Sequence, residues 1–262
     1  MIRVIVHGAL GKLGQEIVRA VSSDPETKLV GAVDFKAAGD FLPLPDGSGQ
    51  VPFSKDTNTI ITKCPADVMF DSTIAKTAMP DLRAAAKKGV NLVIATTGFT
   101  PDDLDEMKKM AAANKIGIII APNFALGSVL MLHLAKIAAK YMDYAEIIEL
   151  HHHLKADAPS GTALNTAKAM AAARGKAFDS PPEMANPSNS RGLEVDGVPI
   201  HAVRLPGLMA HQEVIMGAPG QTLIIRHDTI NRECYAPGIM TAIKEVVKRR
   251  EYIYGLDTLL NL

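Results

Sequence analysis

The alternation of short β-branched runs with helical segments constrains the fold of this chain more than any other feature. Apolar runs typical of buried strands recur five times in the first half of the sequence. They fall at Ile2–Val6, Leu29–Val33, Ala66–Thr73, Asn91–Gly98 and 115–123. Segments with apolar residues on one helical face separate these runs. This order predicts an α/β fold, with an N-terminal doubly wound (Rossmann-like) parallel sheet.

A glycine-rich turn, "HGALGKLG", follows the first of these strands. Gly8 permits a sharp turn, Gly11 lets the backbone approach a pyrophosphate, and Gly14 allows a helix to pack closely on the strand. Asp34 ends the second strand, where an acid binds the hydroxyls of an adenosine ribose. A turn without a ligand is the alternative, but the strand–turn–helix context favours a dinucleotide site.

The residues after Asp34 bear on the choice between NADH and NADPH. A carboxylate repels a 2′-phosphate, so Asp34 favours NADH. The ammonium group of Lys36 could neutralise such a phosphate. We therefore expect use of both NADH and NADPH, with NADH the safer prediction.

The pattern changes after Asp143. A strand is predicted over Tyr144–His153, an alanine-rich helix over Thr162–Arg174 and a long loop over Gly175–Pro199. Three further strands follow with turn dipeptides and no helices between them, at Ile200–Leu205, His211–Met216 and Thr222–His227. Consecutive strands of this kind predict an α+β domain with a mostly antiparallel open sheet.

The last helical segment, Pro237–Lys248, has an apolar face that must be buried. We expect it to return to the first domain. The prediction is a discontinuous dinucleotide-binding domain, residues 1–122 with 232–262, and a substrate-binding and oligomerisation domain, residues 123–231. The Gly- and Pro-rich stretch Lys36–Ser54 is predicted to be an irregular surface excursion.

Composition excludes several classes of protein. The formal net charge is zero and no basic run stands out, which argues against a nucleic-acid or membrane-surface role. Cys64 and Cys234 stand alone, so neither a disulfide framework nor a cysteine metal knuckle is expected, as in a reducing cytoplasm. The opening "MIRVIVHG" is too short an apolar run for a signal peptide.

The stretch "ELHHHLKADAPSGTAL", Glu149–Leu164, concentrates polar side chains that suit proton chemistry. Histidine titrates near neutral pH, and Lys155 is a strong hydrogen-bond donor. The "PSGTAL" segment starts a helix, and the N–H groups of Ser160, Gly161 and Thr162 form an anion cradle. Together with a nicotinamide cofactor, these groups suggest reduction of a small carboxylated molecule.

The three histidines allow two other interpretations. Adjacent strand residues point to opposite faces, so His151 and His153 could share a metal but His152 could not. No H-E-x-x-H motif or thiolate partner accompanies them, and no metal site is expected. A polar strand end at the surface is the remaining alternative.

The long motif "HHHLKADAPSGTA" resembles the signature of the 4-hydroxy-tetrahydrodipicolinate reductase family, formerly called dihydrodipicolinate reductase. In that family it reads roughly E-x-H-H-x-x-K-x-D-A-P-S-G-T-A. The spacing of the glycines, the "TTG" loop and "NF" after the fifth strand also match, and the resemblance covers essentially the whole chain. It implies reduction of an unsaturated cyclic dicarboxylate by NADH or NADPH, on the diaminopimelate route to lysine.

The resemblance also implies roles for individual residues. His151 would be the catalytic proton donor or acceptor and Lys155 its partner general acid. His152 would contact substrate, and Ser160, Gly161 and Thr162 would hold one of its carboxylates. The cofactor would be surrounded by residues from four loops: Gly8, Ala9, Leu10, Gly11, Lys12, Leu13, Asp34, Ala95, Thr96, Thr97, Ala121, Pro122, Asn123 and Phe124.

Family members are commonly homotetramers built through the sheet of the second domain, so a homotetramer is expected. Phe35 stands where some members carry an arginine for the 2′-phosphate. Strand parity would group His151, His153 and Lys155, whereas the family pattern uses His152, and the sequence does not decide between them. Another amino-acid-pathway dehydrogenase of the same plan, or a non-catalytic dinucleotide sensor, remains an alternative.

Overall fold

The computed structural model describes residues 1–180 and 189–262 and divides into two compact units. The first unit contains Met1–Leu126 and Arg232–Leu262, and the second contains Gly127–Asn231. Each unit has its own sheet and its own buried apolar core, and each is described by itself below.

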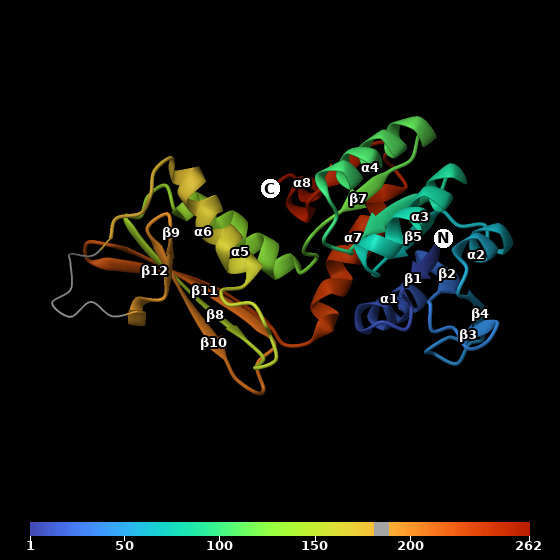
Figure 1. Cartoon of the computed structure of the whole chain (residues 1–262), viewed down its shortest axis with the longest axis horizontal. Coiled ribbons are helices and arrows are strands. Elements are labelled where there is room, and N and C mark those ends of the chain that lie inside the picture. Colours follow the sequence, from blue (N-terminus) through green and yellow to red (C-terminus); the bar gives the residue numbers. More distant parts are fainter. Residues whose placement is uncertain (181–188) are drawn as a thin grey trace. The chain divides into compact units, whose positions relative to one another are not determined.

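The first unit is built on an eight-stranded sheet in the order β13-β7-β6-β5-β1-β2-β4-β3 (Figure 1). Its strands are β1 (Ile2–His7), β2 (Thr27–Val33), β3 (Phe41–Pro43), β4 (Gln50–Ser54), β5 (Val68–Asp71), β6 (Asn91–Ile94), β7 (Ile118–Ile120) and β13 (Tyr252–Tyr254). All neighbours pair in parallel except β3 and β4. The order of the parallel strands runs outward from β1 in both directions, so the predicted doubly wound α/β fold is confirmed.

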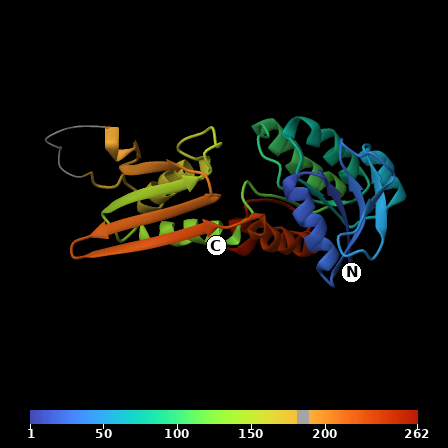
Figure 2. The same cartoon turned by 90° about the horizontal axis from the view of Figure 1, so that it is seen from below.

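Helices cover both faces of this sheet. They are α1 (Lys12–Ser23), α2 (Thr57–Lys63), α3 (Ala75–Lys87), α4 (Pro101–Asn114), α7 (Ala236–Val246) and α8 (Leu256–Leu260), with a short 3-10 turn η2 (Arg232–Tyr235) before α7. In Figure 2, α1 in blue and α7 in red lie on one side of the sheet and the green and cyan helices on the other. One shared cluster of buried side chains joins α2, α3 and α4 to the sheet, with Ile60, Leu82 and Met107 among its members.

The prediction of an irregular excursion over Lys36–Ser54 was wrong in part. Strands β3 and β4 form a hairpin there, and β4 extends the sheet in parallel with β2. Val51 and Phe53 are buried on the sheet, while the turn from Leu44 to Gly49 closes with backbone hydrogen bonds. Two alternating apolar residues are too short a run to stand out against the surrounding Gly and Pro.

The second unit is a five-stranded sheet in the order β12-β11-β8-β10-β9. Its strands are β8 (Tyr144–His151), β9 (Leu193–Val195), β10 (Val198–Arg204), β11 (Ala210–Ala218) and β12 (Gln221–Thr229). Only β8 and β10 pair in parallel, so the predicted mostly antiparallel open sheet is confirmed. Part of the loop predicted over Gly175–Pro199 lies outside the described residues, and β9 and β10 start within it.

Two helices, α5 (Leu126–Ala138) and α6 (Gly161–Arg174), lie along one face of the second sheet (Figure 1). A cluster of buried side chains joins them to it: Met131 and Ala135 from α5, Ala167 and Met170 from α6, and Ile147 from β8. A 3-10 turn, η1 (Asn189–Arg191), precedes β9. Among the residues described, no helix is both long enough and apolar enough to cross a membrane.

Candidate active site

A cavity of about 710 Å³ opens at the carboxyl ends of β1, β2 and β5 in the first unit. This volume is within the range of small-molecule sites, and this edge is where doubly wound sheets bind ligands. Its lining is His7, Gly8, Leu10, Gly11, Asp34, Phe35, Lys36, Lys55, Ser72, Thr73, Ile74, Thr77 and Asp81. Four of the predicted cofactor residues (Gly8, Leu10, Gly11 and Asp34) are therefore brought together.

The glycines of the turn are required by the backbone itself. Gly8 has a φ of +86°, a region that favours glycine. A Cβ on Gly14 would lie 1.9 Å from the carbonyl oxygen of Gly8, so α1 can approach the turn only with glycine at this position. Gly11 is the N-cap of α1 and has no side chain to bond the first N–H groups of the helix. The turn thus offers donors to an anion, as a dinucleotide requires.

Asp34 fixes the loop after β2 to the glycine turn. Its carboxylate accepts hydrogen bonds from the backbone N–H of Leu10 (2.8 Å) and of Lys36 (2.9 Å), and the residue is 4% exposed. Each carboxylate oxygen keeps a second lone pair for the hydroxyls of a ribose. Phe35 beside it is 77% exposed, with the ammonium of Lys36 5.3 Å from its ring centroid. The residues present fit an adenosine group.

The other predicted cofactor loops lie at the same edge of the sheet but outside this cavity. The residues Ala95–Thr97 follow β6, and Ala121–Phe124 follow β7. Thr96 is buried and donates its hydroxyl to Asp71 (2.5 Å), whereas the side-chain oxygen of Asn123 accepts from the N–H of Ala125 (2.9 Å). Lys12 and Leu13 begin α1, and Ala9 is buried beneath the turn.

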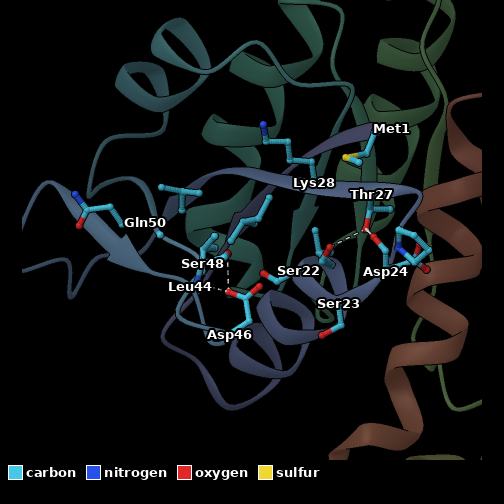
Figure 3. A pocket seen from close by; sticks show the side chains of 15 residues that line it. Met1, Ser22, Ser23, Asp24, Thr27, Lys28, Leu44, Asp46, Ser48 and Gln50 are labelled. Carbon is cyan, nitrogen blue, oxygen red and sulfur yellow. Dashed lines mark hydrogen bonds between the residues drawn. The ribbon is translucent and has the colours of Figure 1, made fainter.

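A second hollow, shown in Figure 3, lies at the opposite, amino-terminal edge of the same sheet. Met1, Thr27 and Lys28 line it at the starts of β1 and β2. Its carboxylates already have partners: Asp24 pairs with Lys244 (2.8 Å), and Asp46 accepts from the hydroxyl of Ser48 (2.7 Å). We assign no function to this hollow.

In the second unit, a buried carboxylate orients the first of the three histidines. Glu149 is 0% exposed, and its Oε2 lies 2.5 Å from Nδ1 of His151. Both residues lie on β8 two positions apart, so their side chains share a face of the strand. An ionised carboxylate only accepts hydrogen bonds, so Nδ1 of His151 must carry the proton and its Nε2 is the nitrogen left for substrate.

Arg204 holds this carboxylate from the neighbouring strand. The parallel register of β10 and β8 places Arg204 opposite His151. The guanidinium donates to both oxygens of Glu149 (2.9 and 2.7 Å) and to the carbonyl of Asp157 (2.7 Å). A bidentate pair of this kind fixes the orientation of the Glu149 carboxylate.

The same carboxylate reaches the start of α6. The N–H of Ser160 donates to Oε1 of Glu149 (3.1 Å), and the hydroxyl of Ser160 caps the helix by accepting from Ala163 (3.1 Å). The Ser160 N–H is therefore engaged within the protein and does not point to the outside. A Cβ on Gly161 would meet no described atom within 4 Å, so packing does not require this glycine. A ligand that approaches the start of α6 would explain why a glycine stands at this position.

Lys155 lies in the loop between β8 and α6. Its ammonium donates to Asp157 (2.6 Å), and this bond is the main cause that lowers the pKa of Asp157, with a smaller effect from the backbone of Gly161. The carboxylate of Asp157 is therefore stabilised by Lys155 and by the backbone of Gly161, the same groups that we expect to hold a substrate carboxylate. β8 ends at His151, so the exposed His152 and His153 lie beyond the strand and parity does not apply to them.

The protonation state of His151 follows from its surroundings. Burial lowers its pKa from the ordinary value of 6.5, and this effect outweighs the opposing attraction of Glu149. The nearby positive charges of Lys155 and Arg204 also lower this pKa. The neutral form of His151 is therefore favoured at neutral pH. In the parts of the chain that the structure describes, no three His, Cys, Asp or Glu side chains are grouped as a metal site.

Two family models of known proteins match the chain, one over each part of the sequence. The model of the dihydrodipicolinate reductase N-terminus matches residues 2–124, and the model of its C-terminus matches residues 127–260. The chain belongs to the dihydrodipicolinate reductase family. The resemblance seen in the sequence is thereby confirmed, together with the class of enzyme, a reductase.

Curated relatives cover the full length of the chain. A 4-hydroxy-tetrahydrodipicolinate reductase of Dehalococcoides mccartyi is 54% identical over 100% of this chain and 99% of its own length. The enzyme of the same name from Moorella thermoacetica is 43% identical over 99% and 98%. A solved dipicolinate-bound dihydrodipicolinate reductase from Paenisporosarcina sp. TG-14 superposes with a TM-score of 0.89, at 40% identity and 99% coverage of both chains.

Several groups in these two sites were missed by the sequence analysis. Arg204 gave no local signal, because only strand pairing brings it to Glu149. Glu149 itself lies in the quoted motif, and its spacing of two residues from His151 could have indicated a carboxylate–histidine pair. Asp71 and Asp81 lie on either side of His7, although nothing in the spacing of the sequence shows it.

Proposed function

We propose that this chain reduces 4-hydroxy-tetrahydrodipicolinate, or its dehydrated form, to tetrahydrodipicolinate with NADH or NADPH. The substrate class, a small cyclic dicarboxylate, follows from the family and from the dipicolinate of the Paenisporosarcina structure. The observation that carries the proposal is the Glu149–His151 pair beside the start of α6 and Lys155. It combines a proton relay with carboxylate-binding groups in the segment that runs from β8 to the start of α6.

The first unit supplies the cofactor site in this proposal. The glycine turn holds the pyrophosphate at the start of α1 and Asp34 binds the ribose, with the loops at Ala95–Thr97 and Ala121–Phe124 completing the site. When bound, the reduced nicotinamide supplies a hydride. Because Asp34 disfavours a 2′-phosphate and Lys36 favours one, both NADH and NADPH are accepted.

The second unit holds the ring and moves the proton. One carboxylate of the substrate replaces Asp157 on Lys155 and on the N–H of Gly161. It also accepts from the N–H of Thr162, with His152 and the Ser160 hydroxyl alongside. Negative charge on the bound substrate raises the pKa of His151 and favours its imidazolium. His151 and Lys155 then deliver the proton that quenches the enamine formed by hydride addition.

A coupled assay tests this function directly. The substrate is made in the cuvette from pyruvate and aspartate semialdehyde, and the absorbance of NADH and of NADPH is followed separately. Both His151→Gln and Lys155→Ala are expected to lower turnover at least about 10²-fold while NADH affinity stays close to wild type. Loss of NADH binding in both variants would show that the motif has a structural role. Oxidation of aspartate or homoserine would favour another dehydrogenase, and NADH binding without turnover would favour a sensor.

We also propose that the chain forms a homotetramer and works in the cytoplasm. Leu223 and Ile224 on β12 expose apolar side chains on the second sheet, which supports association of copies through this sheet. The small substrate and the absence of basic runs are the reasons to expect no nucleic-acid partner and no membrane partner. Light scattering of the purified chain measures the oligomeric state.

A further inference from the structure

His7 is a titratable side chain held between two carboxylates in the wall of the cofactor cavity. It ends β1, immediately before the glycine turn, and is only 6% exposed. Its Nδ1 lies 2.8 Å from Oδ1 of Asp71, and its Nε2 lies 3.3 Å from Oδ2 of Asp81. Both ring nitrogens therefore lie within ion-pair distance of a carboxylate oxygen, although Nδ1 makes no hydrogen bond.

This geometry calls for the imidazolium. A neutral histidine has one ring nitrogen without a proton, and in either tautomer that nitrogen would lie within ion-pair distance of a carboxylate. Asp71 has no exposed surface, and its oxygens also accept from the hydroxyls of Thr73 (2.9 Å) and Thr96 (2.5 Å). Burial lowers the pKa of His7, but the ion pair with Asp71 and the charges of Asp81 and Asp34 outweigh burial and raise it.

The charges that face His7 come from four elements of the first unit. Asp71 ends β5, Asp81 lies on α3 and Asp34 follows β2, while the cations of the cavity wall are Lys36 and Lys55. With His7 protonated, three carboxylates stand against three cations. When His7 loses its proton, the same surroundings carry a net negative charge of one, beside a turn that has to bind a doubly charged pyrophosphate.

We propose that His7, held as an imidazolium between Asp71 and Asp81, is a cofactor-binding residue whose proton sets the affinity of this chain for NADH and NADPH. This inference rests on the proposed function of the first unit. It adds to the cofactor site the positive charge of His7, which the glycine pattern does not predict. The cofactor then binds tightly while His7 is protonated and less tightly above its pKa, because an anionic ligand meets one more unpaired carboxylate.

The test is the dissociation constant of NADH measured by calorimetry on the full chain, between about pH 6 and pH 9.5 at constant ionic strength. We expect the wild-type affinity to fall about tenfold across the titration of His7. In His7→Gln the affinity should stay at the weak, alkaline wild-type level throughout. The matched control is His153→Gln, which replaces an exposed histidine of the second unit. Its affinity for NADH should change with pH as that of wild type does.

A second variant keeps the test independent of how His7→Gln folds. Asp81→Asn removes one of the two carboxylates that stabilise the imidazolium, so the midpoint of the affinity change should move to lower pH. A wild-type affinity that does not vary with pH, an unshifted midpoint in Asp81→Asn, or the same pH dependence in His7→Gln as in wild type would each overturn the inference. Failure to bind NADH at any pH would instead contradict the proposed function.

Discussion

The carboxylate of Glu149 and the imidazole of His151 meet at 2.5 Å on one face of β8, and Arg204 holds the carboxylate from the adjacent strand. Two different strands therefore determine which nitrogen of His151 is protonated. Because Glu149 also accepts from the N–H of Ser160, the same carboxylate links the proton relay to the start of α6.

Glu149→Gln should lower kcat about 10²-fold without changing NADH affinity. Arg204 and Ser160 bind the amide oxygen of the new side chain, so its NH₂ group faces Nδ1 and forces the proton of His151 onto Nε2. The control is Glu146→Gln on the same strand, because Glu146 also pairs with a histidine, His201 (2.8 Å). Equal losses in the two variants would show that Glu149 contributes only to stability.

The pH dependence of the two kinetic constants should differ. Burial lowers the pKa of His151 in the free protein, so the limb of kcat/KM that reports this residue should lie below 6.5. In the complex, the negative charge of the bound dicarboxylate favours the imidazolium of His151. The limb of kcat that reports this residue should therefore lie at higher pH than the limb of kcat/KM. Profiles of wild type and His151→Gln measure both, and a limb that persists in the variant would assign it to another group.

Lys36→Ala should separate the two cofactors. The ammonium of Lys36 is at the edge of the cavity next to Asp34, where it can neutralise a 2′-phosphate. Its removal should weaken NADPH binding about tenfold more than it weakens NADH binding. Lys28→Ala, in the hollow of Figure 3, is the control and should alter neither dissociation constant. A parallel loss for NADH and NADPH would place Lys36 away from the 2′-position.

Two Gly→Ala substitutions should have opposite consequences. Gly14→Ala puts a Cβ 1.9 Å from the Gly8 carbonyl and should lower the free energy of unfolding by about 3 kcal/mol or more. Gly161→Ala puts a Cβ where no described atom lies within 4 Å, so stability should be unchanged or slightly higher.

The variants are compared by thermal unfolding and by KM for the cyclic dicarboxylate. For Gly161→Ala we expect a KM raised about tenfold, because the new methyl group occupies the approach to the helix start. A KM equal to that of wild type would remove Gly161 from the substrate site.

The chain itself determined the architecture. Ile2–His7 and the other β-branched runs alternate with helical segments, and this local pattern sufficed to predict a parallel sheet followed by a mostly antiparallel one. The turn at Gly8 and the signature around His151 are contiguous in sequence, so the family could be predicted from residues alone. The hairpin of β3 and β4 could not, because its short strands depend on pairing with β2.

Only the tertiary structure decided how the charges of each site are compensated. Arg204 reaches Glu149 across the register of two strands, and Asp71 and Asp81 reach His7 from β5 and α3, all separated from their partners by more than fifty residues. Hydrogen bonds and ion pairs depend on distances of about 3 Å between side chains, and periodicity along the sequence carries no information about such distances. A linear pattern can therefore specify the elements and the family, whereas the protonation states of His7 and His151 follow from the folded arrangement around them.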